Sequence, residues 1–143
     1  MKKIIFFIAT IFAFSFDIDD LDKGIHAVKN GNFEQGFEIF FAGCEAGDTL
    51  ACEELGYMYI NNEVSEKTDT RLVEIPSIQL GIRYLVKSCS LGYLNGCSSI
   101  LDLAKEVQIP DEVLKATKDK YDELAVEFVE DLNATIGGQN QAK

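Results

Sequence analysis

The residues of this chain with the most distinctive chemistry are four cysteines, arranged as two pairs with the same spacing. Cys44 and Cys52 are eight residues apart, as are Cys89 and Cys97, and the second pair follows the first by 45 residues. In an oxidising compartment, evenly spaced pairs of this kind indicate disulfides. Four cysteines allow three connectivities, and the repeat favours the local one, Cys44 with Cys52 and Cys89 with Cys97.

Two other uses of these cysteines stay open on the sequence alone. One is a zinc site with four thiolate ligands, although such sites usually place their cysteines about two to four residues apart. The other is a redox-active pair, although the chain contains no Cys-x-x-Cys motif. We therefore predict two disulfides, no metal site and no cofactor.

Three segments place apolar side chains at helical spacing. The first two have identical spacing and end at the first cysteine of each pair, and the third ends at a phenylalanine instead. Their members are Phe33, Phe37, Phe40, Phe41 and Cys44; Ile78, Ile82, Leu85, Val86 and Cys89; and Thr117, Tyr121, Leu124, Ala125 and Phe128. We expect them to be the second helices of three successive helix hairpins, the last being a capping helix over 111–134.

The first helix of each hairpin should precede these segments. We expect helices over 20–29, from an N-cap at Asp48 onward, and over 93–107. Gly47 and Gly92 follow the first cysteine of each pair by three residues, where a helix often ends with a left-handed glycine. Each pair would then join the end of one helix to the start of the next. Strand patterns are nearly absent, so the predicted fold class is all-α, a short α/α solenoid of about three hairpins.

The N-terminus has the pattern of a bacterial signal peptide. Residues 1–3 are Met-Lys-Lys, residues 4–14 are almost entirely apolar, and Ala13 and Ser15 are the small residues that a signal peptidase reads. An uncleaved anchor is the alternative, but eleven residues are fewer than the roughly 20 that cross a bilayer. We predict a signal peptide over 1–15, no later membrane attachment, and a periplasmic or secreted protein.

The charge of the chain restricts its partners. The net charge is −11, and loss of the two lysines of the predicted signal peptide would make it −13. Such a field repels phosphate backbones and anionic membrane surfaces, which argues against nucleic-acid binding. The acidity has solubility as its simplest explanation, and it also fits a protein or peptide partner that is basic.

One segment is similar to a known repeat. Residues 41–59, FAGCEAGDTLACEELGYMY, resemble the Sel1-like repeat in the disulfide-bearing form of the Helicobacter cysteine-rich protein family. Residues 85–103 match the cysteines and Gly92, but Leu101 and Ala104 replace the glycine and tyrosine of the Leu-Gly-x-x-Tyr motif. The resemblance covers about residues 22–105. It implies a right-handed, tetratricopeptide-like solenoid over 16–134 and an exported scaffold that binds other proteins.

The chain departs from that family in its long spacing. The family repeat has about 36 residues, whereas the cysteine pairs here are 45 apart, and the surplus falls in residues 61–77. We expect a long polar loop there, at the rim of any binding surface. The predicted binding residues are Tyr57, Tyr84, Tyr93, and, from this loop, Glu63 and Arg71, whereas Tyr59 is expected to pack inside. Residues 135–143 are predicted to be a disordered tail.

Some members of the family carry a β-lactamase label, which makes a hydrolase acting on β-lactams or cell-wall precursors the alternative function. No serine here has a lysine three residues later, and Thr117-x-x-Lys120 is the nearest match to that motif. The only histidine is His26, too few for a zinc hydrolase. The residues therefore predict no catalytic site, and binding is the preferred function.

Overall fold

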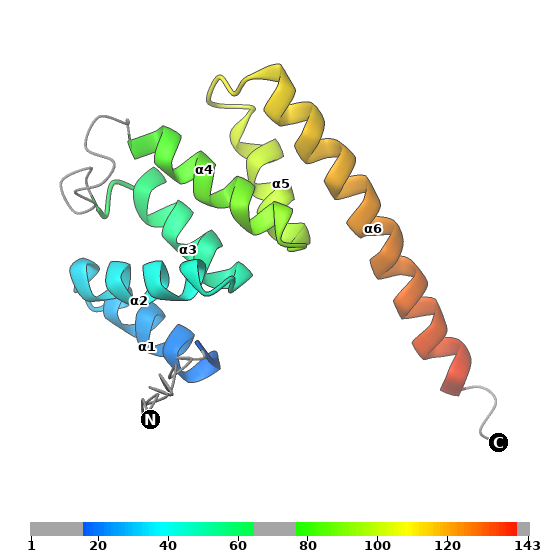
Figure 1. Ribbon diagram of the computed structural model, residues 1–143, viewed down its shortest axis with the longest axis horizontal. Helices are drawn as coiled ribbons and strands as arrows, with labels where there is room; N and C mark the ends of the chain where they lie inside the picture. The colour runs from blue at the N-terminus through cyan, green and yellow to red at the C-terminus, as the bar shows by residue number, and fades with distance from the viewer. Residues whose placement is uncertain (1–15, 65–76, 140–143) are drawn as a thin grey trace, which may run out of the picture.

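The computed structural model describes residues 16–64 and 77–139, and all regular secondary structure in this part of the chain is helical. The predicted signal peptide, Arg71, most of the 61–77 loop and the last four residues lie outside it. Six helices follow one another, as Figure 1 shows: α1 Ile18–Lys29, α2 Phe33–Glu45, α3 Thr49–Ile60, α4 Ser77–Ser90, α5 Leu94–Leu103 and α6 Asp111–Gln139. The prediction of an all-α fold with two disulfides is confirmed for the described residues.

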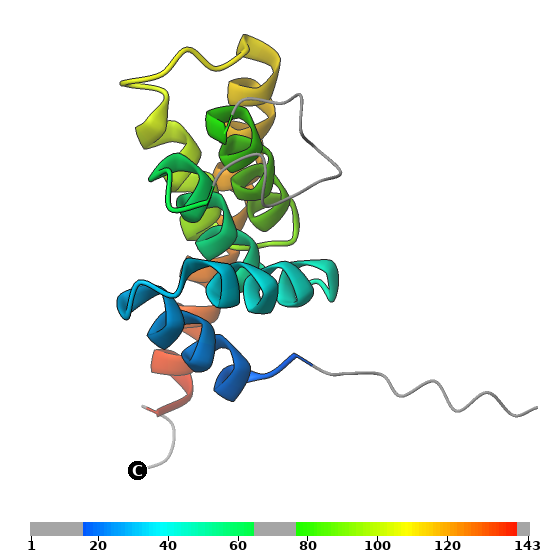
Figure 2. The ribbon, with the colours of Figure 1, turned by 90° about the vertical axis from the view of Figure 1, so that its left-hand side faces the viewer.

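The helices pack mainly in chain order. Each helix contacts the one before it and the one after it, the α3–α4 contact is the most extensive, and α6 also touches α4. Figures 1 and 2 show α1 and α2 at one end of this succession and α6 along the other side. Packing between sequence neighbours is what a stack of hairpins produces.

The turns between α2 and α3 and between α4 and α5 form as the glycines predict. Gly47 has a φ of 93° and Gly92 a φ of 100°, in the left-handed region where a side chain would be strained. Asp48 caps α3, because its carboxylate accepts a hydrogen bond from the Ala51 backbone N–H at 2.8 Å. The short reversal brings the first turn of each new helix beside the last turn of the helix before it.

Both predicted disulfides form across these turns. Cys44 pairs with Cys52 and Cys89 with Cys97, with Cα–Cα distances of 4.5 and 4.6 Å. All four cysteines are buried. The local connectivity is therefore confirmed, and the described residues contain no free cysteine.

The interior consists of two clusters that meet at α4. The first gathers residues of α1 to α4 around Phe40 and Leu55, both fully buried, and contains the Cys44–Cys52 bridge. The second gathers residues of α4 to α6 around Leu85 and contains the other bridge. Each disulfide thus belongs to its own part of the core.

The α3–α4 contact depends on two glycines that the sequence places inside helices. A Cβ atom at Gly81 would lie 2.8 Å from the carbonyl oxygen of Gly56 and 2.5 Å from Ile60. The absence of a side chain lets the two backbones approach, which is why this pair of helices packs so closely.

The C-terminal part of the fold differs from the prediction in two respects. α5 ends at Leu103 rather than at 107. The N–H groups of Lys105 and Glu106 bond to carbonyls three residues back, and the chain then turns to bury Ile109 in the second cluster. α6 begins after Pro110, as predicted, but it continues to Gln139 rather than ending at 134. The first residues of the predicted tail are therefore helical.

Candidate functional site

A groove between α3 and α5 contains a hydrogen-bonded group of polar side chains. Its volume is about 250 Å³. α3 and α5 each contribute one face of side chains, and the lining residues are Tyr57, Ile60, Leu85, Ser98, Ser99, Asp102, Leu103 and Glu106. The floor is apolar and the rim bears hydroxyls and carboxylates, a combination typical of peptide-binding surfaces.

A hydrogen-bonded chain of three side chains joins the two helices in this groove. The Ser99 hydroxyl donates to the Glu53 carboxylate at 3.2 Å, and the Tyr57 hydroxyl lies 2.6 Å from Ser99 Oγ. Since the Ser99 hydrogen is directed to Glu53, the Tyr57 hydroxyl is the donor in the second bond. Glu53 is buried, whereas Tyr57 is 37% exposed, so the tyrosine ring remains accessible.

The carboxylates beside this network are electrostatically strained. Burial raises the pKa of Glu53, and the hydrogen bond from Ser99 only partly offsets it. Burial also raises the pKa of Glu54, with further increases from the negative charges of Glu53 and Glu63 against a decrease from Lys29. A basic group placed in this region would relieve that repulsion.

The raised pKa of Glu53 predicts a specific pH dependence of stability. Because the folded protein holds this proton more tightly than the unfolded chain, ionisation of Glu53 favours unfolding. The stability that protonated Glu53 contributes to the folded protein is therefore lost as the pH rises from the ordinary glutamate pKa through the raised pKa. We expect Glu53→Gln to flatten the decline in the free energy of unfolding over this window, measured by urea denaturation at a series of pH values. The exposed Glu34→Gln serves as the matched control, and equal slopes in the two variants would contradict the assignment.

The structure separates the predicted binding residues rather than bringing them together. Tyr57 lies in the groove and is accessible. Tyr93 is half-buried at the N-cap of α5, where its hydroxyl accepts a hydrogen bond from Asn95 at 3.1 Å. Glu63 is half-buried just after α3, and Arg71 lies outside the described residues.

The prediction of Tyr84 as a surface residue is wrong. It is 6% exposed, and its ring stacks on Tyr59 with a centroid distance of 5.7 Å. The close α3–α4 contact covers this face of α4. Tyr59 is fully buried, in agreement with the packing role expected of it.

Glu53 and Ser99 were not among the predicted site residues, although the repeat contains a signal for them. Ser98 and Ser99 follow Glu53 and Glu54 by 45 residues, the spacing of the cysteine pairs. Equivalent positions of successive repeats occupy neighbouring places in a stack. Aligning polar residues as well as cysteines would therefore have brought these glutamates and serines together, although the observed pair, Glu53 and Ser99, is offset from that alignment by one residue.

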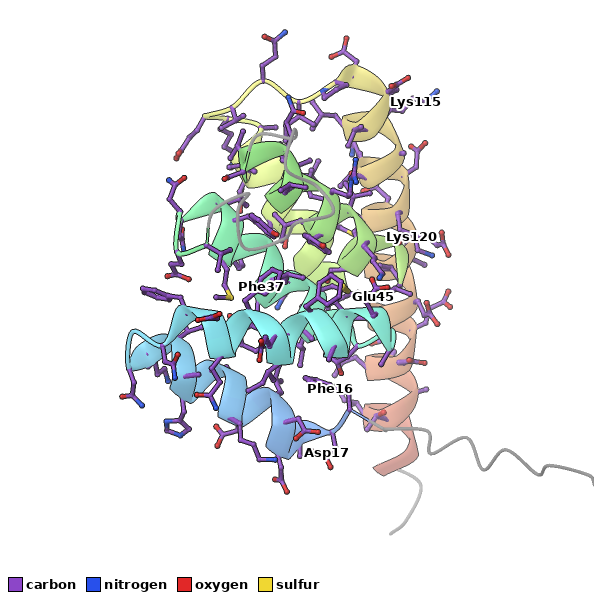
Figure 3. All side chains as sticks on the ribbon, turned by 60° about the vertical axis from the view of Figure 1, so that its left-hand side comes forward. Phe16, Asp17, Phe37, Glu45, Lys115 and Lys120 are labelled. Carbon is purple, nitrogen blue, oxygen red and sulfur yellow. A yellow bond between two sulfur atoms is a disulfide. The ribbon has the colours of Figure 1, made fainter. Side chains whose placement is uncertain are left out.

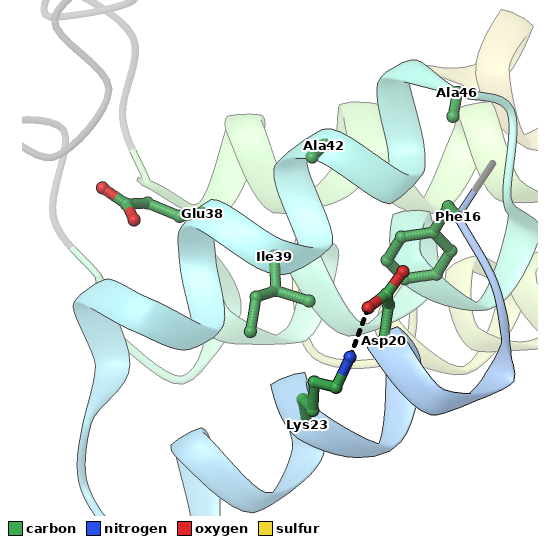
Figure 4. Close-up of a pocket in the computed structure, with 7 residues that line it drawn as sticks. All are labelled: Phe16, Asp20, Lys23, Glu38, Ile39, Ala42 and Ala46. Carbon is green, nitrogen blue, oxygen red and sulfur yellow. Dashed lines mark hydrogen bonds and ion pairs between the residues drawn. The ribbon is translucent and has the colours of Figure 1, made fainter. Parts of the chain in front are cut away.

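A second pocket lies between α1 and α2, with a volume of about 300 Å³. Figure 4 shows the Phe16 ring beside Ala42 of α2 and Ala46, which follows that helix, with Ile39 one turn earlier in α2. The Lys23–Asp20 ion pair, at 2.8 Å, crosses its edge. Figure 3 places Phe16 just ahead of α1, at the N-terminal end of the described structure. Lys23 is already paired with Asp20, so the pocket offers a ligand mainly apolar surface and few free polar groups.

The groove has few features of an active centre. Ser99 is paired with a carboxylate, but it lies mid-helix, where backbone N–H groups are bonded within α5 and do not form an oxyanion hole. Within the described ranges, no three metal-binding side chains are close enough to hold an ion. No helix in that part of the chain combines the length and apolarity needed to cross a bilayer.

Comparisons with known proteins add no family. No protein-family model matches the chain, and no curated protein or solved structure matches it either. The resemblance to the Sel1-like repeat therefore rests on the cysteine frame and its flanking residues.

Proposed function

We propose that this chain is an exported, disulfide-stabilised solenoid of the Sel1-like type that binds a basic segment of another protein. The observation that supports this function best is the α3–α5 groove, where an accessible tyrosine sits over an apolar floor beside a buried glutamate. Tyrosine supplies contact area at low entropic cost and often dominates interface energies. Two buried disulfides suit the oxidising environment of the periplasm or the extracellular space.

The charge of the groove favours a basic ligand. Asp102 and Glu106 are exposed on the α5 side, and Glu53 contacts the groove from the α3 side through its hydrogen bond from Ser99. Lys105 pairs with Asp102 at 2.6 Å, but both side chains are exposed, so an incoming lysine or arginine can compete for Asp102 as well as bind Glu106. The groove takes a short peptide segment rather than a large apolar surface.

An array of random-sequence peptides probed with the oxidised protein tests this function. We expect the retained peptides to be enriched in lysine and arginine. In the triple variant Tyr57→Ala, Asp102→Asn, Glu106→Gln, affinity for these peptides should fall by about tenfold or more, a loss of about 1.4 kcal/mol or more. The matched control, Asp22→Asn with Glu34→Gln, removes two exposed carboxylates away from the groove. Tyr121→Ala is not used as a control for Tyr57→Ala, because Tyr121 packs against the second core cluster.

Two results would contradict the proposed function. The first is an absence of peptides retained above the background of an unrelated acidic protein. The second is retention of the same peptides, with unchanged affinity, by the triple variant. In either case the groove does not bind a basic segment.

A further inference from the structure

The distal half of α6 presents an apolar face that no other described part of the chain covers. Five of its large apolar side chains are about half exposed or more: Val126 58%, Phe128 61%, Val129 52%, Leu132 48% and Ile136 54%. Figure 1 shows this half of α6, coloured orange to red, continuing beyond α4 and α5. Contiguous exposed apolar surface of this kind marks an interaction site more often than isolated side chains do.

This apolar face continues a packing surface that the protein already uses. Thr117 is buried, and Tyr121 and Leu124 pack against the second core cluster. Phe128 and Leu132 follow at the same helical spacing, so they lie on the same side of α6 as the residues that contact the core. Contact between α6 and the core therefore stops where the underlying helices end, although the apolar pattern of α6 continues.

The distal half of α6 lacks the packing that usually stabilises a helix. Residues 126–136 are exposed throughout. A segment of this length is marginally helical on its own, and most helical stability in proteins comes from packing of an apolar face. Covering the face with another helix would supply that packing.

Acidic side chains flank the apolar face of the distal half, which restricts what can cover it: at helical spacing Glu130 and Asp131 lie at its two edges and Glu127 lies behind it. Within the described structure, α6 has no lysine or arginine after Lys120. Asp122 and Glu123 are paired with lysines of the preceding turn, at 3.1 and 2.9 Å. Glu127, Glu130 and Asp131 lie further along the exposed part of the helix without a basic residue in that part of the chain. A second copy would bring these charges against its own, whereas a basic partner would neutralise them.

We propose that the distal half of α6 is a docking surface for a basic amphipathic helix of another protein. The apolar side chains recur at helical spacing along a straight rod, so an antiparallel or parallel helix packs along them with its own apolar stripe. Lysine or arginine residues at the edges of that stripe pair with Glu130 and Asp131, which flank it, and the charge of Glu127 adds to the attraction. This surface is separate from the α3–α5 groove, and the proposal does not depend on the groove.

A designed peptide tests the proposal directly. The probe is a fluorescent amphipathic peptide of about 18 residues, or five helical turns, with leucine on one face and lysine on the other. A second peptide has glutamate in place of every lysine. We expect the lysine peptide to bind the oxidised protein in fluorescence anisotropy and the glutamate peptide to bind about tenfold more weakly or worse.

Variants of α6 locate the binding. We expect Phe128→Ser with Leu132→Ser to weaken binding of the lysine peptide by about tenfold or more. Glu127→Gln, Glu130→Gln and Asp131→Asn together should weaken it and reduce its dependence on salt. The control, Ile18→Ser with Leu91→Ser, removes two exposed apolar side chains elsewhere and should leave binding unchanged. Circular dichroism of each variant verifies its helical content.

Three outcomes would overturn the proposal. These are no binding of the lysine peptide, equal binding by the serine variant and the unmodified protein, or self-association through α6 that prevents the peptide from binding. The triple variant of the groove should bind this peptide normally. Loss of binding in that variant, with none in the serine variant of α6, would assign the peptide to the groove instead.

Discussion

Removing both disulfides is expected to lower the free energy of unfolding by about 5 kcal/mol, with each bridge contributing about 2.5 kcal/mol. Each bridge closes a loop with a sequence separation of eight residues, and the chain-entropy model gives this magnitude for so short a loop. Marginal domains have a total stability of only about 5–15 kcal/mol, so the loss is large. Denaturation by urea of the variants Cys44→Ala with Cys52→Ala, and Cys89→Ala with Cys97→Ala, measures it.

The two bridges should contribute additively, because they belong to different core clusters. The variant lacking all four cysteines should therefore lose the sum of the two paired variants. Treating the unmodified protein with a reductant should produce a comparable loss, which controls for the change of side chain. Unchanged unfolding in either paired variant would show that its bridge does not restrict the unfolded chain.

Truncating Phe40 to alanine is expected to lower the free energy of unfolding by about 3–5 kcal/mol, the range for a fully buried phenylalanine. Its side chain is fully buried in the first cluster. A Cβ atom at Gly24 would lie 2.4 Å from its ring, so α1 packs directly against it. The substitution leaves a cavity between α1 and α2 that the backbone closes only in part. Urea denaturation monitored by circular dichroism measures the loss.

Phe33 provides the matched control, since it is a phenylalanine of the same helix. It is 36% exposed, and Phe33→Ala should cost about 1 kcal/mol or less. A similar loss in the two variants would mean that the apolar stripe of α2 is not oriented as the structure has it.

The features that the sequence predicts well are those encoded locally. The cysteine spacing, the glycine three residues after each first cysteine and the Asp48 cap all lie within one turn between helices. Their geometry follows from the backbone preferences of a few neighbouring residues, so the pairing and the left-handed glycines could be inferred in advance. The helical periodicity likewise identified α2 and α4.

The features that the sequence does not predict depend on contacts between distant residues. Tyr57 and Tyr84 are both tyrosines on helices, but only the α3–α4 packing determines that Tyr84 is covered and Tyr57 is not. The Ser99–Glu53 hydrogen bond joins residues 46 positions apart. Phe128 continues a regular apolar stripe, and nothing in that stripe shows where the supporting helices end. The burial of a side chain and its long-range hydrogen bonds depend on how the helices pack, which the local sequence pattern does not specify.

Each disulfide connects the end of one helix to the start of the next and so fixes consecutive helices side by side. Peptide mapping of the purified protein, alkylated without reduction, by mass spectrometry tests this connectivity most directly. We predict two linked peptide pairs, one containing Cys44 and Cys52 and the other containing Cys89 and Cys97, with no free thiol. Free cysteines, or links between the first pair and the second, would contradict the account.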